Sequence, residues 1–190
     1  MAAWPRPRWA GVVRLAQAAL AIELLLTCPM RPERLCRLHL GQNVVRQGKG
    51  RGGRVYVRRP GAAPDGDREP VYQLSRQSGA ILDHYVRRYL SRSTGSGYLF
   101  AAWRSTCPRH YGGFHPMVRS AIRMLLAADL NPTDLRFIAG VLHVDRSPDR
   151  TEVVSRLLGH RSTDYKRRAF SHITMPTNIA AYQRLVVGAR

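Results

Sequence analysis

The chain has 190 residues, the length of one generous domain, and its 44% hydrophobic content is enough for a single buried core. Its 31 Lys and Arg residues against 12 Asp and Glu residues give a formal net charge of +19, which favours a polyanionic partner, with nucleic acid first. The three cysteines are odd in number and form no C-x-x-C pair, so they support neither a disulfide framework nor a zinc site and fit a reducing compartment.

The basic side chains are almost all arginine, because Lys49 and Lys166 are the only lysines. The planar guanidinium fork suits bidentate contact with phosphate better than a point-charge ammonium does. A GC-rich genome would produce the same bias, so the ratio alone identifies no partner. The basic residues are spread along the whole chain, which predicts a charged folded surface rather than one basic tail.

The first predicted element is a largely buried helix from Arg8 to Thr27, where apolar positions are dense, and Pro29 is expected to end it. Such a stretch near the N-terminus could imitate a signal peptide or a membrane span. Three charged or polar residues interrupt it: Arg14, Gln17 and Glu23. We therefore expect an amphipathic core helix and no membrane association.

A short second helix is expected from Glu33 to Leu40, with Gly41 marking its end. The stretch that follows differs in kind. Residues 54–57 and 70–74 are short β-prone runs on either side of 60–67, a loop rich in turn-forming residues. An antiparallel hairpin is the natural interpretation.

The second half is predicted to be almost all helix. The expected helices are Ser78–Leu90, Pro116–Ala128, Asp134–Val144, Arg150–Leu158 and Thr177–Val187. Val118, Ala121, Ile122 and Leu125 are expected on the inner face of the second of these, and Leu135, Ile138, Ala139 and Leu142 on that of the third. Asn131-Pro132 separates those two helices, and Gly159 stands in a position typical of a helix C-cap.

Two arginine-bearing segments lie 105 residues apart in this layout. They are Cys28-Pro-Met-Arg31-Pro-Glu-Arg-Leu35 and Asn131-Pro-Thr-Asp-Leu-Arg136, and Leu157-Leu-Gly-His160 follows them. A lone arginine is usually an ordinary surface residue. As an ordered set, the three segments are typical of a layout that grips phosphate.

These segments carry a resemblance to a known family, together with the hairpin and two further stretches, Glu152-Val-Val154 and Phe170-Ser-His-Ile173. From about Ala10 to Val186 the chain resembles the catalytic domain of the tyrosine recombinases, also called phage integrases. The resemblance implies a mainly α fold with a small antiparallel β-hairpin sheet. It also implies an activity that cuts and rejoins double-stranded DNA through a phosphotyrosine link, without a metal or other cofactor.

The residue types fit that chemistry. In-line attack on a phosphodiester builds charge on the non-bridging oxygens, and two bracketing arginines stabilise it. By the resemblance, Arg31 and Arg136 hold those two positions, and His160 holds that of a histidine near the scissile phosphate that donates or orients a proton.

The chain departs from the family at two supporting positions. Thr133 stands where the family box places a histidine, three residues before the second arginine, so one acid–base group is lost. The family also carries a lysine in or beside the β-hairpin that protonates the leaving oxygen. Residues 65–67, Asp-Gly-Asp, occupy that place in one register, and Lys49 is the only candidate in another.

The largest departure is at the nucleophile, because Phe170 stands where the family has tyrosine and a phenyl ring has no oxygen to form the link. Tyr165 is a poor substitute, since five residues along a helix mean about 140° off the same face and about 7.5 Å along the axis. Four basic neighbours are candidate phosphate contacts: Arg161, Lys166, Arg167 and Arg168. Strand cleavage is therefore expected to be lost.

We expect one catalytic-type domain over residues 1–190, with 1–9 as a flexible arm and 177–187 as a C-terminal helix that docks on the body or on a neighbouring protomer. The family's N-terminal core-binding domain is expected to be absent, because only nine residues precede the predicted helical core. A DNA-binding protein of this kind is expected in the cytoplasm, associated with the nucleoid.

Three interpretations stay open. The first is an integrase-family protein that binds DNA without cutting it, alone, as a homo-oligomer or beside a full-length recombinase. The second is an active recombinase that uses Tyr165 or a partner subunit's tyrosine. The third is a general basic protein that coats nucleic acid, with strong salt dependence and no preference for paired inverted sites. The first accounts for the charge, the motifs and the losses together.

Overall fold

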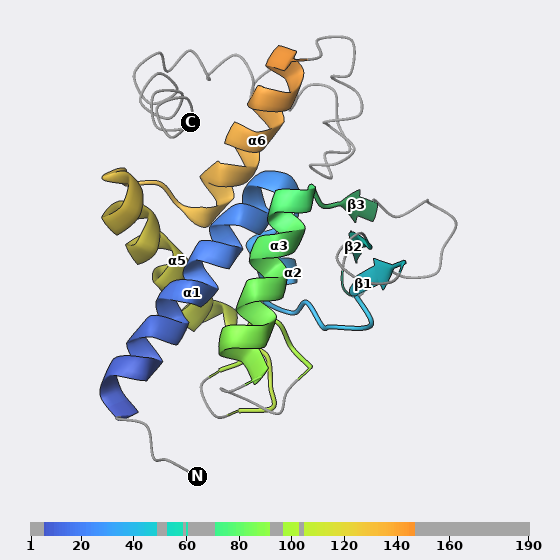
Figure 1. Cartoon of the computed structure of the whole chain (residues 1–190). Coiled ribbons are helices and arrows are strands. Elements are labelled where there is room, and N and C mark those ends of the chain that lie inside the picture. Colours follow the sequence, from blue (N-terminus) through green and yellow to red (C-terminus); the bar gives the residue numbers. More distant parts are fainter. Residues whose placement is uncertain are drawn as a thin grey trace.

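The computed structural model describes residues 6–48, 53–58, 60, 71–91, 97–102 and 105–146. These residues are mostly helical and include a small antiparallel sheet (Figure 1), which confirms the predicted fold class. The elements are α1 (Arg6–Thr27), α2 (Pro32–Leu35), β1 (Val44–Gln47), β2 (Arg54–Arg58), β3 (Val71–Gln73), α3 (Arg76–Tyr85), the π-helical turn η2 (Val86–Leu90), α5 (Tyr111–Leu126) and α6 (Pro132–Arg146).

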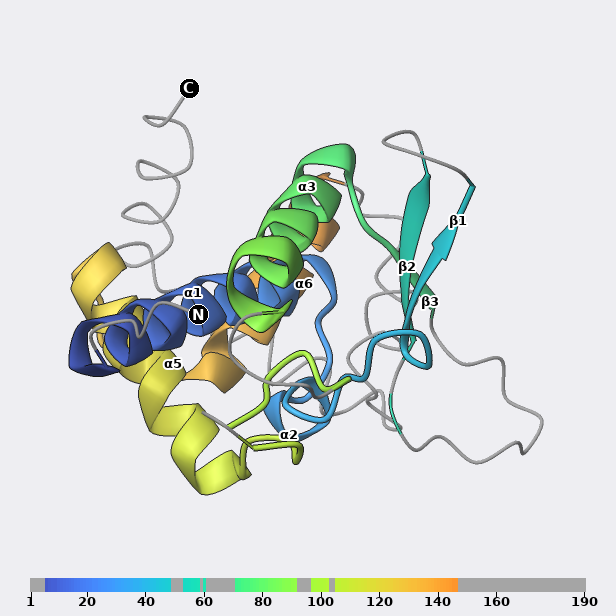
Figure 2. The same cartoon turned by 60° about the horizontal axis from the view of Figure 1, so that its bottom comes forward.

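Helix α1 is the centre of the molecule, in contact with α2, α3, α5 and α6. Figures 1 and 2 both show α1 and α3 side by side, with α5 on one side and the sheet on the other. Its inner face is fully buried at Ala21, Leu24 and Leu25. The helix begins at Arg6, so residues 6–9, which were predicted to belong to a flexible arm, are helical.

Helix α1 is apolar enough to resemble a membrane-spanning helix. Trp9–Thr27 is the one helix in the described part of the chain that is long and apolar enough to cross a membrane, a test that a core helix or a signal sequence also passes. Val12 and Leu15 on its N-terminal half are about two-fifths exposed, whereas the C-terminal half packs into the core. The polar Gln17 is also buried.

The sheet has the strand order β1-β2-β3, with both pairs antiparallel. The predicted hairpin is confirmed, because β2 pairs with β3 in the register Val57↔Tyr72. The first strand was not predicted. It pairs with β2 from Val44↔Val57 to Gln47↔Arg54, and every second residue of β2 points into the core.

The helix predicted over Ser78–Leu90 is present but begins at Arg76 and finishes as a π-helical turn. Ser75 caps its start, since its hydroxyl oxygen accepts a hydrogen bond from the Ser78 backbone N–H at 3.0 Å. The short helix after α1 covers only Pro32–Leu35 instead of Glu33–Leu40, because residues 39 and 40 pair as isolated β-bridges.

Helix α5 begins at Tyr111, five residues before its predicted start at Pro116. His110 makes this possible, because its Nδ1 accepts a hydrogen bond from the backbone N–H of Gly112 at 3.1 Å. Leu125 was predicted to be buried, and this is wrong: it is 51% exposed near the helix end. Helix α6 extends the predicted Asp134–Val144 at both ends, and the predicted helices 150–158 and 177–187 lie outside the described residues.

Candidate functional site

Arg31 lies where the chain leaves α1 and enters α2. Cys28 and Met30 just before it are buried, which anchors this connection to the core. Arg31 has extended backbone angles (φ −63°, ψ 138°) and caps α2, so its carbonyl oxygen accepts hydrogen bonds from the Arg34 and Leu35 N–H groups at 2.9 and 3.0 Å. Pro32 follows at the first helical position, where its missing N–H costs nothing. An exposed guanidinium therefore extends from a fixed backbone.

Arg136 lies one turn into α6 and is almost buried, with 7% of its surface exposed. Its Nε donates a hydrogen bond of 3.1 Å to the carbonyl oxygen of Pro29. Pro29 is only two residues before Arg31, so this bond joins the two arginine segments across 107 residues of sequence. The structure thus brings the two predicted arginines to the same region of the molecule.

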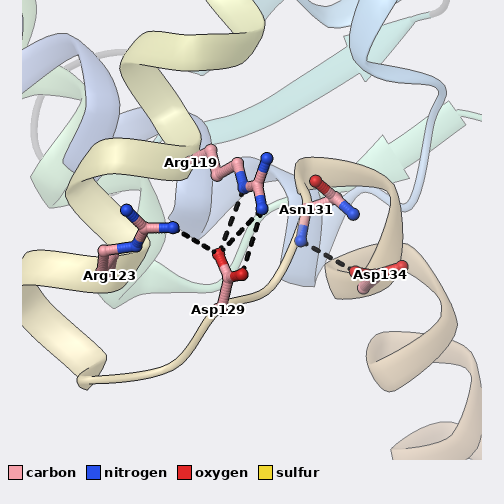
Figure 3. A network of polar contacts seen from close by, with 5 residues as sticks. All are labelled: Arg119, Arg123, Asp129, Asn131 and Asp134. Atoms are coloured by element: carbon pink, nitrogen blue, oxygen red, sulfur yellow. Dashed lines mark hydrogen bonds and ion pairs between the residues drawn. The ribbon is translucent and has the colours of Figure 1, made fainter.

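The start of α6 is itself well fixed. The Asp134 carboxylate accepts a hydrogen bond from the Asn131 backbone N–H at 2.8 Å (Figure 3). The Asp134 backbone N–H in turn donates to the Asn131 backbone carbonyl at 2.9 Å. The carboxylate bond to the Asn131 N–H is one half of a capping box, and with the backbone bond it closes the first turn. Leu135 is fully buried next to Arg136, which holds the turn against the core. Thr133 is half-buried, three residues before Arg136, on the same side of the helix.

The connection from α5 into α6 carries a second polar cluster, which Figure 3 shows beside the first. Asp129 in this connection accepts hydrogen bonds from two arginines of α5, Arg119 and Arg123. These hydrogen bonds, first from Arg123 and then from Arg119, lower the pKa of the Asp129 carboxyl, so it is charged at neutral pH. Sequence reasoning missed this cluster, although Arg119 and Arg123 are spaced i and i+4 on a predicted helix.

Helix α2 is tied to its surroundings by two more side chains. Arg34 donates from Nη1 to the Pro60 carbonyl oxygen at 2.8 Å, which links α2 to the end of β2. Tyr111 begins α5, and burial together with the nearby Glu33 carboxylate raises the pKa of its hydroxyl. Arg34 and Glu33 both belong to the first arginine segment, and their supporting contacts were not predicted.

The remaining predicted site residues lie outside the described part of the chain: Lys49, His160, Arg161, Tyr165, Lys166, Arg167, Arg168 and Phe170. Lys49 falls in the connection between β1 and β2, whose flanking residues pair as Gln47↔Arg54. Among the residues that the structure does describe, no group of three or more His, Cys, Asp or Glu side chains is placed to hold a metal ion.

No protein-family model matches this chain, and no curated protein matches it. Solved structures do. XerH site-specific recombinase in a post-cleavage complex with a palindromic difH substrate is 18% identical at a TM-score of 0.64, over 92% of this chain and 45% of that one. XerA recombinase is 18% identical at a TM-score of 0.59, over 100% of this chain and 66% of that one.

A lambda integrase dimer bound to a COC′ core site is 17% identical at a TM-score of 0.51, over 82% of this chain and 45% of that one. The chain thus spans less than half the length of the XerH and lambda integrase chains and 66% of the XerA chain. The likeness is one of fold, which in this chain is mostly helical with a small antiparallel sheet. The described chain has a tyrosine-recombinase-like fold.

Proposed function

We propose that this protein binds double-stranded DNA through a phosphate pocket formed by Arg31, Arg136 and His160, and that it does not cleave the DNA it binds. The single observation that carries the proposal is the hydrogen bond from Arg136 to the Pro29 carbonyl. It joins two segments that sequence alone could only list in order. The fold and the net charge of +19 support the same conclusion.

The pair of arginines suits a phosphodiester for a physical reason. Arg136 is almost buried, and its Nε donates to the Pro29 carbonyl, which fixes the orientation of the guanidinium. A phosphate of DNA next to Arg136 and the exposed Arg31 would meet two guanidinium forks, whose geometry matches its oxygens.

The loss of cleavage follows from residue types and not from geometry. Phe170 has no nucleophilic oxygen and Thr133 cannot act as the acid–base group that a histidine would be. A pocket that lacks both groups can still hold phosphate, because holding requires charge and hydrogen-bond donors only. DNA binding is therefore the function that survives these substitutions.

The proposal extends to the chain's assembly and location. The lambda integrase relative is a dimer on its DNA. We propose that this protein also meets DNA beside a second subunit, a copy of itself or a full-length recombinase, and that residues 177–187 dock on that subunit. The protein's place in the cell would be the cytoplasm, on the nucleoid.

A second candidate function is an active recombinase that takes its nucleophile from Tyr165 or from a partner subunit. Lys49 would supply the leaving-group proton in that case, and it lies in the β1–β2 connection, where the Gln47↔Arg54 pair closes a hairpin. A third is a general nucleic-acid coat, in which Arg161, Lys166, Arg167 and Arg168 would contribute no more than other cations.

The test uses nicked suicide duplexes that carry candidate attachment sequences. Denaturing gels detect a covalent protein–DNA adduct, and filter binding on the same samples measures affinity. We expect binding without adduct, and much weaker binding for Arg31→Ala and Arg136→Ala. An adduct that disappears in Tyr165→Phe would replace this proposal with the active recombinase. If Arg31→Ala and Arg136→Ala lose no more DNA affinity than an alanine variant of an exposed arginine elsewhere, the general nucleic-acid coat is favoured.

A further inference from the structure

The connection between α5 and α6 is short and closely held. It consists of residues 127–131, since α5 ends at Leu126 and α6 begins at Pro132. Ala127 at the C-cap of α5 has left-handed backbone angles (φ 49°, ψ 30°), which are uncommon for a residue with a Cβ. Only these five residues separate the two helix ends.

Asp129 holds the middle of this connection onto α5 (Figure 3). The Nε and Nη2 atoms of Arg119 donate to its Oδ1 at 3.2 and 3.0 Å, and the same Nη2 donates to Oδ2 at 3.1 Å. Nη2 of Arg123 donates to Oδ1 at 3.0 Å. Single exposed ion pairs contribute little, but a bidentate network with several charges is the case in which the geometry is fixed.

Asp129 is connected to Arg136 by a short run of chain whose hydrogen bonds are described above. Two residues after Asp129, Asn131 enters the reciprocal hydrogen bonds with Asp134 that close the first turn of α6. Arg136 follows within the next turn and reaches the Pro29 carbonyl. The carboxylate, the capped turn and the arginine are therefore consecutive parts of one short segment.

We propose that Asp129 is a positioning residue for Arg136: the Arg119–Asp129–Arg123 network fixes the start of α6 so that the Arg136 guanidinium is held ready for a phosphate. The inference rests on the proposed function and adds to it a residue that touches no phosphate. It also assigns a role to an acidic side chain on a strongly basic protein, where a carboxylate would otherwise oppose a polyanion.

The direction in which Asp129→Asn changes DNA affinity distinguishes a positioning role from a simple effect of charge. Asp129→Asn removes one negative charge and releases two arginines, so electrostatics alone predicts tighter binding to DNA. Positioning predicts the opposite, because the start of α6 loses its attachment to α5. We expect Asp129→Asn to bind a short mixed-sequence duplex about two- to five-fold more weakly than the unchanged protein, the size of a coupled surface network.

Two companion variants keep the test specific. Asp83→Asn is the matched control, because Asp83 is also a partly exposed carboxylate paired with an arginine, Arg46, but lies on α3 next to the sheet. It should bind DNA as tightly as the unchanged protein or more tightly. Asp129→Glu keeps the charge and the acceptor oxygens and should restore most of the affinity. Thermal unfolding of each variant, monitored by circular dichroism, verifies that all of them are folded.

A double-mutant cycle with Arg136→Ala completes the design. If Asp129 acts through Arg136, Asp129→Asn weakens binding in the unchanged background and no longer does so once Arg136 is alanine. Equal weakening in both backgrounds, or no weakening in the first, overturns the positioning role. If Arg136→Ala alone leaves affinity unchanged, the phosphate pocket itself fails, and that failure is seen separately from that of Asp129.

Discussion

The Nε atom of Arg136 donates a hydrogen bond of 3.1 Å to the carbonyl oxygen of Pro29, two residues before Arg31. This bond fixes the plane of a nearly buried guanidinium relative to the connection that carries an exposed one. Because the bond uses the backbone of the first segment, it survives any change in the Arg31 side chain. The geometry of the pair therefore depends on Arg136 more than on Arg31.

We expect Arg136→Lys to weaken DNA binding about ten-fold or more although it keeps the charge, because lysine has no planar fork with which to bond both the Pro29 carbonyl and a phosphate. Filter binding at constant salt measures the change. The control is Arg88→Lys, an exposed arginine of the π-helical turn, which should bind within about two-fold of the unchanged protein. Equal affinities for all three proteins would contradict the role of Arg136.

Within the described residues, the sequence predicted the four longer helices and one hairpin, because their apolar residues recur at helical and strand periods. It missed β1, since Val44 and Val45 are followed by polar, exposed Arg46 and Gln47, so this strand shows too little apolar alternation. It also missed the early start of α5, where two glycines follow His110 and the cap comes from a histidine ring. The local pattern of apolar residues did not reveal the pairing of β1 with β2 or the His110 cap of α5.

For the candidate site, motif order in the sequence singled out Arg31 and Arg136 as candidates but did not show which contacts hold them. The Arg136–Pro29 bond and the Arg34–Pro60 bond join residues 107 and 26 positions apart, and pairing at such distances depends on the packing of whole helices. Asp129 was missed for a related reason: its partners lie six and ten residues earlier in the chain, and acidic residues in a connection usually only cap or solvate it.

A buried polar layer under α1 should be important for stability. Gln17 donates to the Ala101 carbonyl at 2.9 Å and accepts from Nη2 of Arg109 at 2.9 Å, while the Arg109 Nε is buried without a partner. Gln17→Leu should lower the free energy of unfolding by about 2–4 kcal/mol, because it leaves two more buried groups without hydrogen bonds. Urea unfolding measures this, and Gln77→Leu on the exposed face of α3 should change it by less than about 0.5 kcal/mol.

Position 97 requires glycine because the His39 side chain lies close to it, and not because of its backbone angles. A Cβ atom at this position would overlap the imidazole ring of His39, whose Nε2 and Cε1 it would meet. Gly97→Ala should therefore destabilise the protein by about 1–3 kcal/mol. Gly11→Ala on α1, where a Cβ meets open space, should instead stabilise it by about 0.5–1 kcal/mol. If thermal unfolding shows the same sign for both variants, the overlap with His39 is not the cause.

The three thiols should differ sharply in reactivity. Cys107 is exposed, whereas Cys28 and Cys36 are buried and burial raises the pKa of both. Since the thiolate is the reacting form, we expect a disulfide reagent at neutral pH to modify one thiol per chain rapidly and the other two only on unfolding. Cys107→Ser should remove the rapid phase. Two rapid thiols in the native protein would contradict this assignment.

Strong base should destabilise the protein, because burial opposes ionisation of two groups, the Cys28 thiol and the Tyr85 hydroxyl. Burial raises the pKa of the Cys28 thiol to about 12 from 9.0, and that of the Tyr85 hydroxyl to about 12 from 10.0. A raised folded-state pKa of an acid contributes stability that is complete below the unfolded pKa and is lost as pH rises towards the folded one. The loss should therefore begin near pH 9 and amount to about 2–3 kcal/mol by about pH 10.5.

Urea unfolding at a series of pH values measures that loss as a falling free energy of unfolding. Cys28→Ala deletes the larger contribution, so its unfolding free energy should be lower at neutral pH but flatter between about pH 9 and 10.5. Cys107→Ala is the matched control, because an exposed thiol should leave the slope unchanged. If Cys28→Ala keeps the full slope, the alkaline loss arises from groups other than this thiol, and burial at the end of α1 is not what makes the fold sensitive to base.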